Sequence, residues 1–498
     1  MKKNSLLFLL LVSLWICSGF QAEAQTSNPG ESFSEFRNKI LGNYNEFRNT
    51  ILEHYADFLN GEWHEYESLK GLERDSNPKP IVPPSVDNSL FKPTEKPTEE
   101  PREEKPVISS LPDNDKDNDS EGKTSPSESL TPRRDEVLFS FYGIPMTLPD
   151  LDVRIAEDLF SPSDFADQWK NLDKRNVAAK FIPNLKNAIS QIGLNDFLTY
   201  KYLESFANAK FPYAGESSRV SFIHYILVNL GLDVRIAASS KGVPMLLLPF
   251  NQTVYGKSYL ILNNKKYYIF LPDDQEVGSI LNDRVMTCQL PTDVNIGKNM
   301  DLLLGELNIP DKPKEFSLEY GPLHIEGELN ENLIPILYRY PQMPIGAYMK
   351  SNLQPLLRQR LCNQIKSQLG SMDTNEAVET LLHFTQNAFQ YATDDSYHGF
   401  EKPYFLEETL FYPKNDCEDR AIFYSYFLYN ALNRDARLLA FPGHEAVGVH
   451  LDSPVHGTSY RFDDKTFYIS DPTYIGASTG MVMPSFLNVS PVVDFSFE

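Results

Sequence analysis

The stretch Asn415-Asp416-Cys417-Glu418-Asp419-Arg420, followed by the apolar run 421–432, decides how the end of this chain folds. The apolar positions behind Cys417 recur with helical spacing, which predicts a helix that begins at the cysteine. A cysteine at a helix start has its sulfur aimed at unpaired backbone N–H groups, and the helix dipole there stabilises a thiolate. The sequence therefore identifies Cys417 as a candidate nucleophile.

A cysteine nucleophile needs a base and a group that orients the base, and the chain offers both downstream. His444 follows Pro442-Gly443 and opens a strand pattern, and Asp471 closes the next strand pattern. A carboxylate on the adjacent strand can accept the imidazole N–H and fix the tautomer of the ring. We expect Cys417 to attack a carbonyl, His444 to carry the proton and Asp471 to orient the imidazole.

Three carboxylates surround the candidate nucleophile: Asp416, Glu418 and Asp419. They argue against a purely structural, buried cysteine, because burying three carboxylates costs much free energy. They also raise the pKa of a neighbouring thiol, so a nearby imidazolium or a bound cation has to compensate.

The order of Cys417, His444 and Asp471 resembles the triad of the transglutaminase-like superfamily. Asp416-Cys417-Glu418-Asp419 is similar to the signature of the bacterial transglutaminase-like cysteine peptidases, and the resemblance covers residues 375–485. Asp416 stands where true transglutaminases have glycine, which favours the peptidase branch. The resemblance implies an α+β fold of the papain and transglutaminase type, in which the cysteine helix packs on an antiparallel sheet.

The resemblance also implies site residues beyond the triad. An upstream glutamine often supplies an oxyanion donor in this superfamily, and Gln386 is our choice here over Gln390. Some periplasmic relatives bind calcium at acidic residues beside the cysteine, and Asp416 and Glu418 occupy those positions. Two carboxylates alone do not define a calcium site, and no other cofactor is expected.

At 498 residues the chain is expected to hold more than one domain. The expected segments are a signal peptide (1–24), a helical segment with an 11-residue repeat (25–72), a disordered Pro-rich acidic linker (73–134), a middle α+β domain (135–320) and the transglutaminase-like catalytic domain (321–498).

The first residues resemble a secretory signal. Lys2 and Lys3 precede an apolar run over 6–15, and Ala22-Glu23-Ala24 offers a cleavage site. The run is too short to span a bilayer, so we expect an exported protein of the periplasm or cell surface with no transmembrane span. Cys17 invites lipidation, but the bulky residues before it fit a lipidated cysteine poorly.

An aromatic repeat of period eleven runs through residues 31–70, with Phe33, Tyr44, Tyr55 and Tyr66 in register. Eleven residues make three helical turns, so the repeat predicts one aromatic face on a helix. This face either packs on its own domain or docks onto a partner or a second copy of the chain.

The middle block contains a candidate faded copy of the C-terminal domain. Residues 220–238 resemble residues 422–440, and an offset of 202 places Gly215 opposite Cys417 and Gly242 opposite His444. The block is then either a repeat of the fold without its chemistry or a chance match of two apolar helices.

The net charge of −22 repels phosphate backbones, and no Lys/Arg stripe is present, so nucleic acid is not an expected partner. The residues favour an exported cysteine hydrolase that cleaves peptide or isopeptide amides of a protein or peptide substrate through a thioester. One alternative is a protein-crosslinking or deamidating transglutaminase. The other is a non-catalytic binding or scaffold protein of the cell envelope.

Overall fold

The computed structural model describes residues 42, 46, 48–69, 132–272, 284–290, 296–462 and 464–497. The chain divides into two compact units, residues 1–57 and 58–498. The predicted signal peptide, Cys17 and most of the predicted linker lie outside the described residues. Within the described part, no helix has the length and apolar character needed to cross a membrane.

The segment with the aromatic repeat is helical only as far as α3 (Tyr55–Leu59). Strand β1 (Trp63–Tyr66) follows, so the expectation of a helix through residue 72 is wrong for these residues. Asn60-Gly61 explains the change, because Gly commonly ends helices. Tyr66 then pairs with Val285 of an antiparallel sheet instead of occupying a helical face.

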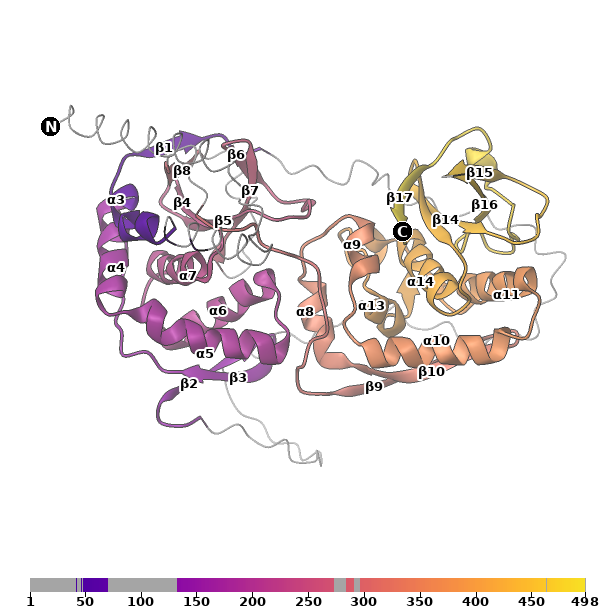
Figure 1. Ribbon diagram of the computed structural model, residues 1–498, viewed down its shortest axis with the longest axis horizontal. Helices are drawn as coiled ribbons and strands as arrows, with labels where there is room; N and C mark the ends of the chain where they lie inside the picture. Colours follow the sequence, from indigo (N-terminus) through magenta and orange to yellow (C-terminus); the bar gives the residue numbers. More distant parts are fainter. Residues whose placement is uncertain are drawn as a thin grey trace, which may run out of the picture. The chain divides into compact units, whose positions relative to one another are not determined.

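The chain is an α+β protein, and its main sheets are antiparallel (Figure 1). The middle block contains β2 (Glu136–Phe141), β3 (Ile144–Pro149), α4 (Pro162–Lys174), α5 (Val177–Ile192), α6 (Asp196–Lys210), α7 (Glu216–Leu230), β4 (Arg235–Ser239), β5 (Pro244–Leu248), β6 (Tyr259–Leu262), β7 (Lys265–Phe270) and β8 (Val285–Cys288). Its sheet has the order β1-β8-β4-β5-β7-β6, and α7 packs on β4 and β5.

The remaining chain builds a second helix-covered sheet. Its elements are β9 (Pro313–Tyr320), β10 (Leu323–Asn330), η4 (Glu331–Leu333), α8 (Ile334–Tyr338), α9 (Ile345–Lys350), α10 (Pro355–Leu369), α11 (Thr374–Asn387), β11 (Gln390–Tyr391), α12 (Asp394–Tyr397), α13 (Leu406–Phe411), β12 (Lys414–Asn415), α14 (Cys417–Asn430), β13 (Ala436–Phe441), β14 (His444–His450), β15 (Ser459–Phe462), β16 (Lys465–Ser470), η5 (Pro484–Phe486) and β17 (Val492–Ser496). The sheet order is β15-β16-β14-β13-β17, and α14 packs on β13 and β14.

The two sheets repeat one topology. Strands β8-β4-β5-β7-β6 of the middle block follow the same order as β17-β13-β14-β16-β15, and α7 precedes its sheet as α14 does. Ion pairs repeat as well: Lys265 Nζ lies 2.6 Å from Asp233 Oδ2, and Lys465 Nζ lies 2.7 Å from Asp435 Oδ2. The middle block therefore shares the strand order of the C-terminal sheet, which favours a repeat of the fold over a chance match of two helices.

The repeat aligns one residue differently from the offset of 202. Gly215 is the N-cap of α7, as Asp416 is of α14, so Glu216 takes the place of Cys417. Gly242 and Gly443 are both turn residues with positive φ, so Val243 takes the place of His444. The middle block thus has neither a cysteine nor a histidine at the equivalent positions.

The expected domain boundary at 320/321 falls inside a hairpin. Strand β9 pairs with β10 from Pro313 to Asn330, and β10 packs against α10. A boundary within a hydrogen-bonded hairpin would separate paired backbone groups, so the C-terminal part begins before Pro313.

A buried ion pair connects α10 to α13. Arg358 Nε and Nη2 each donate to one oxygen of Glu407 at 2.8 Å, and both side chains are almost fully buried. Replacing Arg358 with Met leaves the Glu407 carboxylate buried without its charge partner. We expect a loss of about 3–5 kcal/mol in the free energy of unfolding, measured by urea denaturation.

The control for this prediction is Arg360→Met, because Arg360 is exposed on the same helix. That change is expected to alter the unfolding free energy by less than about 0.5 kcal/mol. A double variant with Arg358→Met and Glu407→Leu should recover most of the lost stability, since it removes both charges. Equal losses in Arg358→Met and Arg360→Met would contradict a structural role for the pair.

Candidate active site

Cys417 is the first residue of α14, as the sequence predicted. Nearly the whole first half of this helix is buried, including Arg420 and Phe423, so the cysteine is held firmly in the core. The N-cap residue Asp416 donates its N–H to Asp419 Oδ2 at 3.3 Å, which fixes the helix start. The sulfur is therefore fixed at the positive end of the helix dipole.

His444 and Asp471 meet at one end of the sheet. His444 is the first residue of β14 and Asp471 follows β16, its antiparallel neighbour. His444 Nε2 lies 2.8 Å from Asp471 Oδ2, and both side chains are 1% exposed. Asp471 Oδ1 accepts the N–H groups of Thr473 and Tyr474, so the carboxylate is held through both oxygens.

The sulfur of Cys417 lies beside the start of β14. The backbone N–H of Glu445, the residue after His444, forms a hydrogen bond with the sulfur that only partly offsets the rise in the pKa of the thiol caused by burial. Sγ itself lies 3.1 Å from Glu418 Oε2, and the described residues show no hydrogen bond between Cys417 and His444. The triad residues are thus brought into one region, but the cysteine and histidine are not joined in this state.

Burial and negative charge work against the cysteine. Cys417 is 4% exposed, and burial together with the carboxylates of Glu418 and Asp416 raises the pKa of its thiol well above the ordinary value. The ring of Phe486 stacks on His444 with the centroids 5.5 Å apart. The thiol is therefore protonated and buried in this state. The sequence predicted this effect, because the carboxylates beside Cys417 raise the pKa of its thiol.

Five carboxylates gather next to Cys417. Oxygens of Asp394, Asp416 and Asp419 lie within 4.8 Å of one another, and so do oxygens of Asp394, Glu401 and Glu418. Burial and the neighbouring carboxylates raise the pKa values of the three aspartates well above the ordinary value. Asp416 Oδ1 is buried and has no hydrogen-bond partner among the described residues.

The nearby cationic side chains direct their hydrogen bonds away from this cluster. Lys402 Nζ bonds Glu408 Oε2 at 2.8 Å. Arg420 donates to Asn415 Oδ1 and to the backbone carbonyl groups of Gln386 and Phe389. The donors of the cluster are all carboxylate oxygens, which fit a hard cation such as Ca²⁺.

Gln386 is not an oxyanion donor, so this expectation is wrong. Its side-chain Nε2 lies 2.9–3.0 Å from the carbonyl oxygens of Asp471, Tyr474 and Ala477, and its Oε1 accepts from Gly476 N–H. The amide is occupied in holding the loop that follows Asp471. Sequence reasoning missed this role because the loop carbonyls lie about ninety residues downstream of the helix.

Replacing Gln386 with Leu is expected to destabilise the fold and not only to slow a reaction. The change leaves three buried carbonyl groups and one N–H without their partner, which costs about 2–3 kcal/mol. Urea unfolding measures this loss. Gln390→Leu is the matched control, because Gln390 is exposed, and an equal effect in both variants would refute the anchoring role.

The chain matches no known family model, and no curated protein matches it. The interpretation of the site therefore rests on its residues and their geometry.

The structure adds three residues to the candidate site that the sequence did not single out: Asp394, Glu401 and Phe486. Asp394 is 22 residues from Asp416, yet its backbone N–H donates to Asp416 Oδ2. The acidic pair Asp394-Asp395 was a weak local signal, because exposed acidic residues are common. Only the burial of Asp394 distinguishes it from its neighbour.

Proposed function

We propose that the C-terminal part of this chain is a cysteine hydrolase that cleaves peptide or isopeptide amides through a thioester. The observation that carries the proposal is the 2.8 Å bond between His444 Nε2 and Asp471 Oδ2, at the sheet end beside the start of the Cys417 helix. A histidine held by a buried carboxylate beside a cysteine at a helix start is the arrangement that nucleophilic cysteine catalysis requires.

The proposed reaction assigns one role to each residue. Nε2 of His444 contacts Asp471, so Nδ1 is the ring nitrogen that takes the thiol proton of Cys417. The thiolate attacks the amide carbonyl, and the imidazolium returns the proton to the leaving amine. Water then attacks the thioester, passes its proton to His444, and releases the acid and the free thiol.

The proposal includes a calcium ion at the carboxylate cluster defined by Asp394, Glu401, Asp416, Glu418 and Asp419. When bound, the ion supplies positive charge that favours the thiolate over the thiol. The cluster residues Asp416 and Glu418 flank the cysteine directly, and their carboxylates are the charges that raise its pKa. In this proposal the acidic hexamer makes the nucleophile dependent on a cation.

The signal-like first residues extend the proposal to an exported enzyme that acts on proteins or peptides in the periplasm or at the cell surface. Transglutaminase chemistry uses the same three residues, with an amine in place of water as the acceptor. The resemblance to the transglutaminase-like superfamily is part of this proposal. The acceptor of the acyl group, water or an amine, distinguishes a hydrolase from a transglutaminase.

Trapping the acyl-enzyme tests this proposal. A peptide ester is mixed with the protein in calcium-containing buffer, quenched in acid and analysed by mass spectrometry. The expected result is an acyl group on Cys417 in the wild type and its absence in Cys417→Ala. Release of free acid indicates a hydrolase, and transfer to an added amine indicates a transglutaminase. No adduct at any substrate concentration would overturn the proposal.

A non-catalytic binding protein is the second candidate, and the buried, protonated thiol favours it. Iodoacetamide labelling near neutral pH separates the two candidates. A hydrolase should label at Cys417 faster than at Cys362, and His444→Ala should slow that labelling. Equal rates, unaffected by calcium or by His444→Ala, would support the binding protein.

A further inference from the structure

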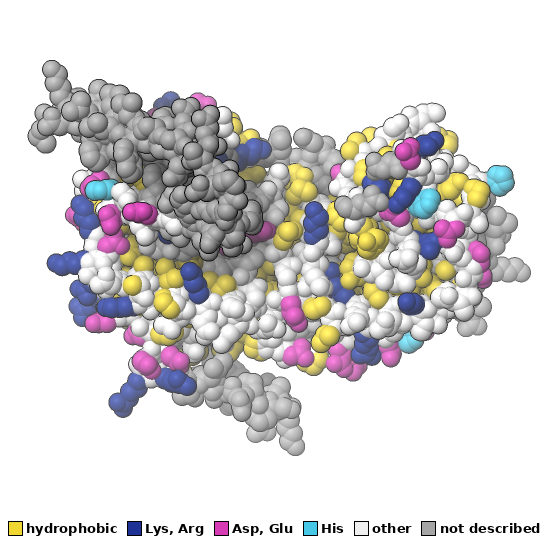
Figure 2. Space-filling view, in the orientation of Figure 1, with side chains coloured by type: hydrophobic (Ala, Val, Ile, Leu, Met, Phe, Trp, Pro, Cys, Tyr) yellow, Lys and Arg dark blue, Asp and Glu magenta, His cyan; other side chains and the backbone are white. Residues whose placement is uncertain are grey.

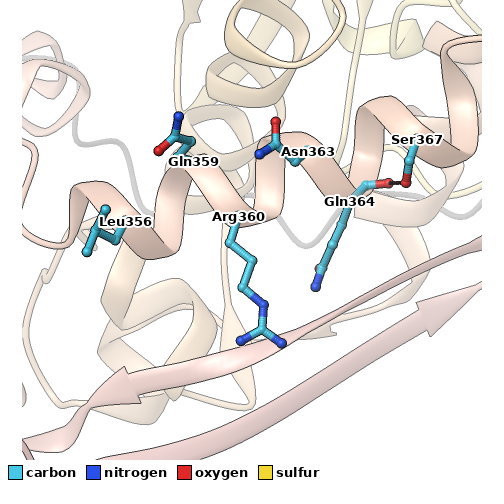
Figure 3. A pocket seen from close by; sticks show the side chains of 6 residues that line it. All are labelled: Leu356, Gln359, Arg360, Asn363, Gln364 and Ser367. Atoms are coloured by element: carbon cyan, nitrogen blue, oxygen red, sulfur yellow. Dashed lines mark hydrogen bonds between the residues drawn. The ribbon is translucent and has the colours of Figure 1, made fainter.

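The hairpin of β9 and β10 has one edge that is closed by side chains of α10. Gln364 donates to Glu326 O at 3.0 Å and accepts from Glu326 N at 3.1 Å. Gln368 makes the same pair of bonds with His324, at 2.7 and 2.9 Å. Figure 3 shows Gln364 and Arg360 extending from the helix toward the strands. The amides thus take the place of a neighbouring strand on the free edge of β10.

Among the described residues, no strand pairs with the other edge of the hairpin. In an antiparallel pair, two facing residues form either a hydrogen-bonded or a non-hydrogen-bonded pair. In a non-hydrogen-bonded pair, the N–H and C=O groups of both residues point away from the partner strand. Glu319 faces His324 and Ser317 faces Glu326, so the N–H and C=O groups of Glu319 and Ser317 point outward from β9. Glu315 follows by the same alternation. No hydrogen bond to these three N–H groups occurs among the described residues.

Strand β9 is long for an unpaired edge. It has eight residues, and Glu315, Ser317 and Glu319 are exposed. Figure 1 shows β9 as the outer strand of the hairpin, on the side away from α10. A row of unpaired N–H and C=O groups of this length is a template for an added strand.

The side chains along this edge define what an added strand must carry. The exposed face of the hairpin is acidic and contains Glu315, Glu319, Glu326 and Glu328. Figure 2 shows Asp and Glu side chains gathered over β9 and β10. On the opposite face of β9, Phe316 and Leu318 are half-buried and Tyr320 is 40% exposed. A strand that alternates basic and apolar side chains complements both faces.

A second copy of β9 does not complement this edge. Centring two antiparallel copies on Ser317 places Glu315 directly opposite Glu319, and like charges there are destabilising. A shift by two residues in one direction pairs Glu319 with Pro313, which has no N–H to donate. The same shift in the other direction pairs Glu315 with Gly321, which lies in the turn beyond the end of β9. The occupant is therefore a different polypeptide.

We propose that β9 binds an extended segment of another protein, in which Lys or Arg alternates with apolar residues, as an added strand. The site lies on the hairpin and uses none of the residues of the Cys417 site. The proposal therefore stands independently of any enzymatic activity.

The test uses the full chain and a fluorescent peptide of about nine residues that alternates Lys and Val, a length that matches β9. Anisotropy should show saturable binding that weakens as salt is added. Ser317→Pro removes one outward N–H that takes no part in the β9–β10 ladder, and edge strands tolerate Pro. We expect Ser317→Pro to weaken binding about tenfold, since it loses a hydrogen bond and obstructs the added strand.

Ser317→Ala is the matched control, because it loses only the hydroxyl contact with His324 Nε2 and keeps the N–H. It should bind like the wild type. Equal binding by Ser317→Pro, with the fold intact by circular dichroism, would overturn the proposal. Absence of any peptide binding to the wild type would overturn it as well.

If Ser317→Pro does not fold, a variant with altered charge on β9 tests the proposal instead. Changing both Glu315 and Glu319 to Lys should weaken peptide binding about tenfold or more, because like charges then face each other. The same charge change at the exposed residues Glu157 and Glu306 should leave binding within about twofold, since screening limits distant charges. Oligolysine of equal charge binding as tightly as the alternating peptide would show a general charge effect and contradict strand addition.

Discussion

Cys417→Ser is expected to lower the rate of peptide amide hydrolysis at least about 1,000-fold, because losing the nucleophile of such a site removes most of its rate enhancement. A serine hydroxyl at the same helix start does not reach the anionic form that a thiol reaches near neutral pH. The measurement is kcat/KM on a peptide identified from the products of the wild-type protein, in calcium-containing buffer.

Cys362→Ser is the control for this result, since Cys362 is a free, partly buried thiol on α10. The same chemical change there should leave the rate within about twofold, as expected for a position away from the site. Thermal melting of both variants shows whether each is folded. A Cys417→Ser protein that melts like the wild type and retains its rate would place the chemistry elsewhere.

Calcium is expected to stabilise the protein more strongly at pH 8 than at pH 5. The pKa values of Asp394, Asp416 and Asp419 are raised in the folded state by burial and mutual repulsion. Their contribution to stability is therefore complete below the unfolded pKa of about 4 and is lost as the pH rises through the folded pKa values. Calcium replaces the lost protons, so its effect grows as the pH increases.

Thermal unfolding with calcium or with a chelator, at both pH values, measures this effect. Calcium at about 100 times its dissociation constant stabilises the folded state by about 2.7 kcal/mol. Asp394→Asn should lose most of the calcium response, and in chelator at pH 8 it should be more stable than the wild type. Asp395→Asn is the matched control, because Asp395 is exposed. The same calcium response in both variants would exclude the cluster as the binding site.

Local patterns in the sequence were sufficient for several elements. The apolar spacing after Cys417 predicted α14 with its first residue at the cysteine. The strand pattern that opens at His444, after Pro442-Gly443, predicted β14, and this strand begins at the histidine. These elements are determined by residues that are close in the sequence, so a sequence pattern is enough to predict them.

The eleven-residue period by itself gives a wrong prediction at Tyr66. The eleven-residue spacing continued through this residue, but Trp63–Tyr66 pairs with β8 and is a strand. Pairing with a segment more than two hundred residues away outweighs helical spacing in a short stretch, because tertiary contacts override local propensity. The Gly at position 61 was the local signal of the change.

The sequence by itself determined which side chains are the candidates for the proposed chemistry: Cys417 at a helix start, and His444 and Asp471 at strand ends. Their order and setting are local properties. Only the tertiary structure decided what surrounds them, because burial and distance depend on segments far apart in the chain. It placed Asp394 and Glu401 in the acidic cluster and turned Gln386 toward the loop carbonyls. Within the part of the chain that the structure describes, it also left the outer edge of β9 without a paired strand, since the side chains of α10 close the edge of β10.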